Sequence, residues 1–473
     1  MTTSLKEHKT KPLPKALSLR KIIGPSFIIL GLGLGSGEVI LWPYLASQYG
    51  MGMIWGAVLG LTLQFFMNME IERYALARGE SIFVGFARKA RWLPFWFALS
   101  TFIPWMWPGI VASSATLISH IFGISDVKYV SVGLLVLMGL ILSLGPVLYK
   151  TVETLQKVLI IAGVPSIFVI SIMLAKPQDW TATAQGLVGV GDGYWLFPVG
   201  IGLAFIATKF TSALAYAGAG GNLNLAQSFY VREKGFGMGK YAGRITSLFT
   251  GKKENVSLEG FKFADTAENT KQFKKWWRTI NTEHFLVFWL TGSITIILLS
   301  LLAYTTTYHV GGLSEGIGFV VNEANVIGER LVPAIGIFFL IVVSLTLFGT
   351  QLTVFDATSR IIAENAVLSA PKMFKANLIP KIYYAVLWLF ISVGIIISLF
   401  FNAQPLQLLV IAAVLNAFAM FVHSGLTVWL NRTNLPKSIR INNWRTAVMV
   451  FACVFYGVFS IFVIVSEVQK LFK

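Results

Sequence analysis

A series of long apolar runs dominates the sequence and limits what the chain can fold into. A helix needs about 20 apolar residues to cross the hydrocarbon core of a bilayer. The sequence is 55% hydrophobic, and only 12% of its residues are charged, about half the roughly 25% of a typical soluble domain. We therefore expect an all-α integral membrane protein with about eleven transmembrane helices, whose main partner is the lipid bilayer. The runs lie at about 22–48, 51–69, 93–122, 129–149, 155–175, 195–230, 284–304, 332–356, 382–401, 405–430 and 446–466.

The basic residues indicate which side of the membrane each loop faces. Lys and Arg concentrate in cytoplasmic loops. With the N-terminus in the cytoplasm, nearly all of the 38 Lys and Arg residues fall in cytoplasmic segments. Two of these segments are the N-terminal arm, 1–21, and a long loop, 231–283. We expect a plasma-membrane protein with a cytoplasmic N-terminus and an external C-terminus, in which Lys253 is cytoplasmic and Glu323 is external. The five predicted external basic residues are Lys128, Lys176, Arg330, Lys470 and Lys473.

The positive charge does not indicate nucleic-acid binding. It is spread over several short cytoplasmic segments, and in the 231–283 loop it is interleaved with acids such as Glu254 and Asp265. Topogenic and lipid-headgroup roles explain such a pattern.

Two of the predicted helices contain glycine-rich stretches, at Gly31–Glu38 in the first and at Tyr216–Asn224 in the sixth. Glycine destabilises a helix, and unwound backbone at membrane depth is tolerated only where protein or a water-filled cavity surrounds it. The two stretches lie five helices apart, which predicts a five-plus-five inverted repeat, leucine-transporter-like, with discontinuous helices 1 and 6 at the substrate site. Close helix packing is the alternative role for such glycines.

The domain organisation follows from this layout. We expect a single transmembrane domain over 22–466. Its first repeat occupies about 22–175 and its second about 195–430, and one extra helix follows at about 446–466.

Around these stretches the sequence resembles the Nramp family of metal transporters. The resemblance lies in Gly24-Pro25-Ser26-Phe27 with Gly35-Ser36-Gly37-Glu38, in Ala219-Gly220-Gly221-Asn222-Leu223, and in Gly349-Thr350-Gln351-Leu352-Thr353 of the eighth helix. It implies eleven helices with the N-terminus inside and a divalent metal as substrate.

The most diagnostic family residues differ here. The family's first-helix Asp and Asn and its sixth-helix Met ligate the metal, and the aligned positions are Gly35, Glu38 and Ala219. Gly221 replaces the family's sixth-helix His, and the third helix, 93–122, holds no carboxylate where relatives carry proton-path acids. Loss of the thioether implies a harder site with oxygen ligands only.

Glu38 is the central candidate for the site, because a carboxylate inside a membrane helix is costly and usually functional. It could bind a cation, carry a proton, or serve a structural role. Lys209, also inside a helix, could compensate this charge, act in gating, or snorkel. Asn222 and Asn224 could be ligands or could cap the second half of helix 6. The candidate substrate or metal site comprises Gly35, Glu38, Ala219, Gly220, Asn222, Asn224 and Gln351.

The sequence favours a secondary active transporter, most simply of divalent metal cations. An ion-coupled carrier of a small organic solute on the same fold is the alternative, since half-helix N-termini and Lys209 could bind a carboxylate. We find no nucleophile–base pair, zinc motif or phosphate-binding loop in the sequence, so we expect neither an enzyme nor a resident cofactor. The expected ligands are transported or coupling ions, such as a divalent cation or a proton.

Overall fold

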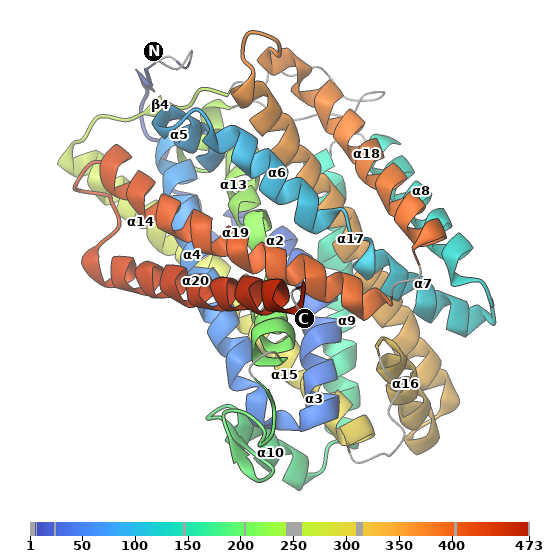
Figure 1. Ribbon diagram of the computed structural model, residues 1–473. Coiled ribbons are helices and arrows are strands. Elements are labelled where there is room, and N and C mark those ends of the chain that lie inside the picture. The colour runs from blue at the N-terminus through green and yellow to red at the C-terminus, as the bar shows by residue number, and fades with distance from the viewer. Residues whose placement is uncertain are drawn as a thin grey trace.

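The computed structural model describes residue 5 and residues 7–22, 25–144, 148–202, 205–242, 258–308, 316–401 and 404–471. These residues are almost entirely helical (Figure 1). The described strands form two small sheets outside the helical bundle. One pairs β1 (Lys9–Thr10) in parallel with β4 (Phe261–Lys262), and the other pairs β2 (Val190–Gly191) antiparallel with β3 (Tyr194–Trp195).

The helices of the first half cover both the N-terminal arm and the first predicted repeat. They are α1 (Leu19–Ile22), α2 (Pro25–Gly33), α3 (Trp42–Tyr49), α4 (Trp55–Arg78), α5 (Ile82–Lys89), α6 (Leu93–Trp105), α7 (Gly109–Phe122), α8 (Val127–Leu144), α9 (Leu148–Leu174) and α10 (Pro177–Gly186).

The second half has the same character. Its helices are α12 (Thr211–Ala215), α13 (Gln227–Lys234), α14 (Ala267–His284), α15 (Thr291–Ala303), α16 (Gly318–Arg330), α17 (Pro333–Ser369), α18 (Ile379–Phe400), α19 (Pro405–Asn434) and α20 (Asn443–Leu471). Stretches of π-helix occupy Leu34–Leu41, Ile206–Phe210, Phe285–Leu290 and Tyr304–Tyr308. Short 3-10 helices occupy Met51–Met53, Gly221–Ala226, Gly237–Tyr241 and Ala376–Leu378.

In the described part of the chain, ten helices are long and apolar enough to cross a membrane. They match ten of the predicted runs. The run that is not among them is the sixth, at 195–230, because its helix is divided into short pieces. The predicted all-α membrane fold is confirmed, and the sixth crossing differs because its backbone is interrupted.

The outer faces of the bundle are apolar. Ile161 of α9 is 64% exposed, Ile396 of α18 is 52% exposed and Val454 of α20 is 56% exposed. A soluble protein rarely exposes apolar residues in such numbers over several helices. Lipid is the solvent that suits these faces.

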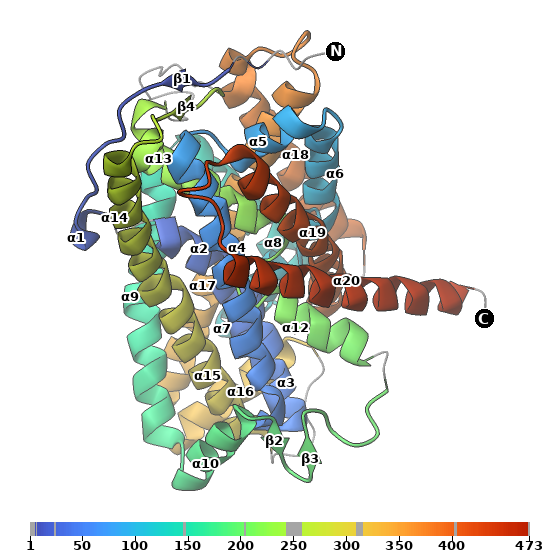
Figure 2. The ribbon, with the colours of Figure 1, turned by 90° about the vertical axis from the view of Figure 1, so that its left-hand side faces the viewer.

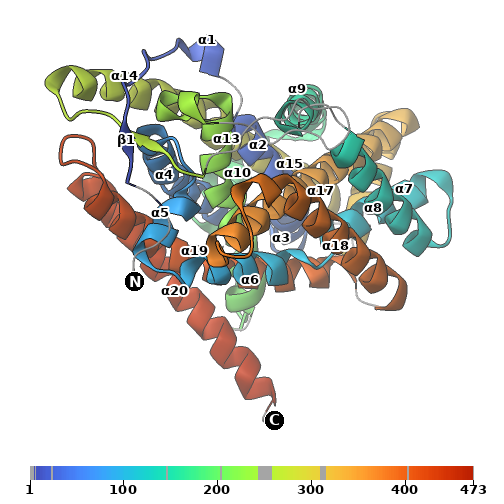
Figure 3. The same cartoon turned by 90° about the horizontal axis from the view of Figure 1, so that it is seen from above.

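The N-terminal arm and the short strands lie at the two ends of the bundle. Figure 2 shows the N-terminal arm with β1, together with β4 and α5, at its top, and α10 with β2 and β3 at the bottom. Helices α4, α9 and α15 run between the two ends, and Figure 3 views the bundle along this direction. Helix α20 lies crosswise to them, so an eleventh crossing at 446–466 remains a prediction from composition.

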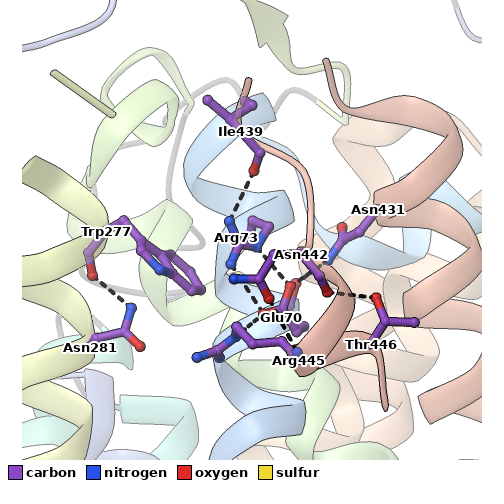
Figure 4. Close-up of polar contacts among 9 residues, drawn as sticks. All are labelled: Glu70, Arg73, Trp277, Asn281, Asn431, Ile439, Asn442, Arg445 and Thr446. Carbon is purple, nitrogen blue, oxygen red and sulfur yellow. Dashed lines mark hydrogen bonds and ion pairs between the residues drawn. The ribbon is translucent and has the colours of Figure 1, made fainter. Parts of the chain in front are cut away.

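A polar cluster fastens the start of α20 to α4 (Figure 4). Glu70 of α4 accepts hydrogen bonds from the Nε atoms of Arg73, at 2.7 Å, and Arg445, at 2.5 Å. Asn431 of α19 donates to the Glu70 carbonyl oxygen at 2.8 Å. Both guanidinium groups lie over the Trp277 ring of α14, at 3.8 Å and 5.2 Å from its centre. The cluster therefore joins four helices through one buried carboxylate.

Candidate functional site

The glycine-rich part of helix 1 is widened rather than broken. Helix α2 passes into a π-helix at Leu34–Leu41, which passes into α3 without a non-helical residue between them. The predicted unwinding of helix 1 is therefore wrong in form, although the interruption lies at the predicted place. A π-helix shifts each hydrogen bond from the fourth to the fifth residue along the chain, so the backbone groups stay paired where a coil would leave them open.

Helix 6 is broken where its glycines predict. Helix α12 ends at Ala215, and the next helical residue is Gly221. Gly220 and Gly221 have φ angles of 75° and 56°, a left-handed conformation that glycine adopts without steric cost. The chain then continues through the 3-10 helix into α13. The predicted discontinuity of helix 6 is confirmed.

The two interrupted helices meet at their glycines. A Cβ atom on Gly37 would lie 1.6 Å from the carbonyl oxygen of Tyr216, and one on Gly33 would lie 2.8 Å from the carbonyl carbon of Gly218. These positions accept no side chain unless the backbones move apart. The glycines thus serve close packing as well as interruption, so both roles considered from the sequence are present.

Side chains from neighbouring helices pair with the open backbone of helix 6. Gln64 of α4 donates to the carbonyl oxygen of Ala215 at 3.1 Å and accepts from the N–H of Gly220 at 3.1 Å. The Nε2 atom of His423 lies 3.0 Å from the carbonyl oxygen of Gly221. These contacts lower the cost of unwinding in an apolar environment. The sequence analysis did not single out Gln64. The feature that could have indicated it is an amide side chain within an apolar run.

Helix α17 packs against the other side of helix 1. The Thr350 hydroxyl donates to the carbonyl oxygen of Gly31 at 2.8 Å, and a Cβ on Gly35 would lie 2.5 Å from the same hydroxyl oxygen. Gln351, the predicted helix 8 ligand, is 2% exposed. Gln156 of α9, also missed from the sequence, donates to the carbonyl oxygen of Gly349 at 2.8 Å. Gly35 is thus a packing position against helix 8.

Glu38 is fully buried within the π-helix. Neither of its carboxylate oxygens has a hydrogen-bond partner among the described residues. Its Oε1 atom lies 3.4 Å from the place of a Cβ on Gly292, so the side chain points toward α15. The neighbouring Ser36 hydroxyl is also buried, and no described residue hydrogen-bonds to it. Helix 1 thus holds buried oxygen atoms that form no hydrogen bond with the described residues and could act as ligands.

The second half of the break contributes amides. Asn222 donates to the hydroxyl oxygens of Ser100 and Thr101 of α6, at 2.9 Å and 3.0 Å. Its Oδ1 atom and both polar atoms of Asn224 are buried without a hydrogen-bond partner in the described structure. The sequence analysis also considered Asn222 and Asn224 as helix caps. No side chain caps the 3-10 helix that follows Gly220, so these caps are not formed.

The predicted site residues do not form one cluster in this structure. Ala219 and Gly220 are buried in the break itself. Asn222 faces α6, whereas Glu38 faces α15. No group of three or more His, Cys, Asp or Glu side chains within the described ranges is placed to hold a metal ion.

Lys209 lies in a separate pocket. It is half-buried, and its Nζ atom donates to the Tyr44 hydroxyl at 3.2 Å and lies 5.1 Å from the centre of that ring. It forms no ion pair with Glu38. The pairing of these two charges, considered from the sequence, is not present in this structure. The pocket is lined by Leu41, Tyr44, Leu45, Lys209, Leu406 and Val410.

Comparison with known proteins identifies the fold. No protein-family model matches the sequence, and no curated protein matches it. A variant of the Eremococcus coleocola manganese transporter superposes with a TM-score of 0.68 at 13% identity, covering 100% of this chain and 92% of that one. The same transporter in complex with an aromatic bis-isothiourea substituted compound gives a TM-score of 0.64 at 12% identity, with the same coverage.

Two further solved structures, each with an organic molecule bound, match less closely. Mhp1, a nucleobase-cation-symport-1 family transporter with bromovinylhydantoin bound, has a TM-score of 0.51 at 13% identity, over 96% of this chain and 95% of that one. MhsT in complex with L-phenylalanine has a TM-score of 0.51 at 12% identity, over 93% and 98%. The chain therefore has the fold of these membrane transporters, with the larger overlap toward the manganese transporter.

Proposed function

We propose that the chain is a secondary active transporter of divalent metal cations that pass between the interrupted helices 1 and 6. The observation that carries this proposal is Glu38, a fully buried carboxylate whose oxygens have no hydrogen-bond partner among the described residues. An ionised carboxylate is very costly in such surroundings unless a proton or a cation neutralises it. It lies beside the glycines through which helix 1 meets the break of helix 6.

The other candidate ligand atoms are oxygens, which favour a hard cation. The Ser36 hydroxyl and the Asn222 and Asn224 amide oxygens are buried oxygen atoms without described partners. Ala219 supplies no thioether at the position where the Nramp family has Met. Oxygen ligands suit Mg²⁺, Ca²⁺ and Mn²⁺, whereas sulfur favours softer ions such as Cd²⁺. Because Glu38 and Asn222 face different helices here, the full ligand set requires a further conformation, as alternating access provides.

The proposal includes an orientation. The arm with β1, together with α5 and β4, lies at one end of the bundle (Figure 2), and the basic loops of the sequence belong to this end. By the positive-inside rule this end faces the cytoplasm. The N-terminus is then cytoplasmic and, with eleven crossings, the C-terminus is external, in a plasma membrane. The two repeats, 22–175 and 195–430, then enter the membrane from opposite sides.

The alternative, a carrier of a small organic solute, is favoured by the pocket around Lys209. An ammonium group beside a tyrosine hydroxyl and apolar side chains suits a carboxylate on an apolar body. The same charge would repel a metal ion nearby. Matches to Mhp1 and MhsT are compatible with this alternative.

Uptake into liposomes containing the purified chain separates the two functions. We expect Mn²⁺ and Mg²⁺ to enter the vesicles, without the strong preference for Cd²⁺ over Mg²⁺ that a sulfur ligand would confer. The variant Glu38→Gln should abolish uptake while remaining folded. Glu323→Gln is the matched control, because Glu323 is also a buried carboxylate, 2% exposed, but belongs to α16 and to neither interrupted helix. Stabilisation by organic acids without uptake of any divalent metal would favour the alternative.

A further inference from the structure

A second group of buried ionisable side chains lies outside the helix 1 and helix 6 junction. Ser26 is at the start of α2, Glu72 is in α4, and Glu283 and His284 end α14. All four are buried, with at most 3% exposure. The Ser26 hydroxyl donates to the Glu283 carboxylate, and its oxygen lies 2.8 Å from Nδ1 of His284. Nδ1 of His284 lies 3.8 Å from Oε1 of Glu72.

Glu72 has no arginine or lysine partner among the described residues, in contrast to the buried acids Glu70, Glu364 and Glu233. Glu70 is paired with two arginines, Glu364 with Arg232, and Glu233 with Arg360. For Glu72, the ion pair found within the described residues is with His284, and its Oε2 atom has no hydrogen-bond partner there. A charge at such a site is costly unless a proton or another cation neutralises it.

Two further buried atoms around Glu72 are also unused. Gln227 of α13 donates through Nε2 to Oε1 of Glu72, and its own Oε1 has no partner in the described structure. The Nε2 atom of His284 is likewise buried without a described partner. From α2 the cluster is faced by Ser26, from α13 by Gln227 and from α4 by Glu72. The cluster can therefore accept at least one more proton than the described contacts use.

The hydrogen bonds around Ser26 form a path for one proton. When Glu283 is protonated, its O–H can donate to the oxygen of Ser26 while the Ser26 hydroxyl donates to Nδ1 of His284. Transfer along both bonds leaves a carboxylate at Glu283 and an imidazolium at His284, with the serine unchanged. The imidazolium would then be attracted to Glu72, which is 3.8 Å away.

The end of α14, the π-helix Phe285–Leu290 and the start of α15 connect this cluster with the site at Glu38. His284, Phe288 and Gly292 follow one another at intervals of four residues, and the His284 ring stacks on Phe288 at 4.7 Å between ring centres. Glu38 contacts the Gly292 position on the same face. The third helix, by contrast, holds no carboxylate. Gly292 and Phe288 thus lie between Glu38 and the cluster at the end of α14.

We propose that Glu72 and His284, linked through Ser26 to Glu283, form the proton-binding site that couples transport to a proton gradient. The inference rests on the proposed function in that it names the coupling ion of the same transporter. The site holds its proton apart from the substrate, so proton and metal do not compete for one carboxylate. Helices α2, α4, α13 and α14 each contribute a side chain to it. Because α2 belongs to helix 1 and α13 to helix 6, the protonation state of the cluster acts on both interrupted helices.

Liposomes containing the full chain and a pH-sensitive dye test this proposal. In the wild type we expect an inward proton gradient to stimulate Mn²⁺ uptake, and Mn²⁺ entry to acidify the lumen. In Glu72→Gln the ratio of uptake with and without the gradient should fall to one and the acidification should vanish, while Mn²⁺ binding is retained. Ser26→Ala keeps both acids but removes the relay, and should lower the ratio even if Glu72→Gln folds poorly. Glu323→Gln should behave as the wild type does.

Infrared difference spectra of the purified protein in acidic and alkaline buffer distinguish failure of this site from failure of the proposed function. We expect Glu72→Gln to remove a protonated-carboxyl band that Glu323→Gln retains, whether or not any metal is transported. Absence of metal uptake by the wild type would overturn the proposed function alone. Retention of that band and of wild-type proton stimulation in both Glu72→Gln and Ser26→Ala would overturn the proton site.

Discussion

At the scale of single residues, the contact between helices 1 and 6 depends on the absence of side chains. Gly37 lies where a Cβ would be 1.6 Å from the Tyr216 carbonyl oxygen, a backbone atom that cannot rotate away. We therefore expect Gly37→Ala to force the two helices apart and to destabilise the protein by more than the roughly 1–3 kcal/mol of ordinary overpacking. Gly133→Ala is the matched control, because no atom lies within 4 Å of its added Cβ.

Thermal unfolding in detergent, followed by the fluorescence of tryptophans, measures this difference. The Gly133→Ala variant should unfold at or slightly above the wild-type temperature, because alanine favours a helix over glycine. Equal unfolding temperatures for Gly37→Ala and the wild type would show that the close contact contributes nothing.

The residues that mark the site could be predicted from the sequence to different degrees. Glu38 and the glycines are conspicuous because acids and glycine clusters are rare within apolar runs. Gln64 and Gln156 were not recognisable, since their role depends on which helix packs beside them, and periodicity within one run carries no such information. Lys209 was conspicuous, but its partner Tyr44 was not, because the pairing depends on the rotation of two helices.

At the scale of elements, two glycine-rich stretches produced two different outcomes. Helix 1 absorbs its glycines in a π-helix, whereas helix 6 opens at Gly220 and Gly221. Glycine content alone does not decide between them, because the outcome depends on outside partners for the backbone. Gln64 and His423 supply such partners to helix 6. The position of each interruption is therefore readable from sequence, while its geometry is set by tertiary contacts.

Contacts of the buried Glu80 carboxylate hold the N-terminal arm to the bundle. Glu80, between α4 and α5, accepts hydrogen bonds from Tyr74 at 2.7 Å and from the N–H of Gly260 at 2.8 Å, and Nε2 of His8 lies 2.9 Å from its Oε1. Burial alone would raise the pKa of Glu80, but the hydrogen bond and charge of His8, with the charge of Arg88, outweigh it and lower this pKa below its ordinary value. The ionised form is therefore the one that the folded arm favours.

This predicts that acid releases the arm. A depressed carboxyl pKa contributes stability that is present above the unfolded value, about 4.3 for Glu, and that is lost as the pH falls through the lower folded value. Hydrogen exchange at residues 7–16 should accordingly remain slow at neutral pH and become fast only below the ordinary Glu range. In Glu80→Gln the exchange should be faster at neutral pH and lose this acid dependence. An unchanged profile would show that other contacts hold the arm.

Because Glu70 attaches α20 to α4, we expect its removal to destabilise the protein strongly. Removal of Glu70 leaves Arg73 and Arg445 buried beside Trp277 without their acid (Figure 4). Breaking a buried ion pair in this way costs about 3–5 kcal/mol. Glu70→Ala should therefore lower the unfolding temperature markedly, whereas Glu268→Ala, which removes an exposed acid from α14, should leave it unchanged. Similar unfolding temperatures for both variants would contradict an anchoring role.

At the scale of the whole molecule, the fold followed from the spacing of apolar runs and from the two glycine-rich stretches. Lipid requires each spanning segment to satisfy its own backbone, which makes membrane helices easier to predict than soluble elements. The course of α20 could not be predicted in this way. Its composition is that of a crossing helix, yet it lies crosswise to α4, α9 and α15 (Figures 1 and 2).

The orientation in the membrane gives the last prediction, and the structure shows where to test it. Lys253, a cytoplasmic residue in the sequence prediction, lies outside the described residues, and Glu323, the predicted external residue, is only 2% exposed and poorly accessible to a reagent. Lys262 of β4 and Asp126 between α7 and α8 are exposed replacements. Because Cys453 is the sole cysteine of the sequence, Cys453→Ser provides a background without thiols.

In that background, an impermeant maleimide should label Asp126→Cys in intact cells, and Lys262→Cys only after the cells are permeabilised. The physical reason is the excess of Lys and Arg on the segments that share an end with β4, because positively charged loops are retained in the cytoplasm. Labelling of Lys262→Cys from outside would show that the orientation is the reverse of the predicted one. A proton would then reach the Glu72 cluster from the opposite side of the membrane. Labelling of both variants in intact cells would instead show that the number of crossings between residues 126 and 262 is even and not three as predicted. The interrupted helix 6 is the crossing at which such an error would arise.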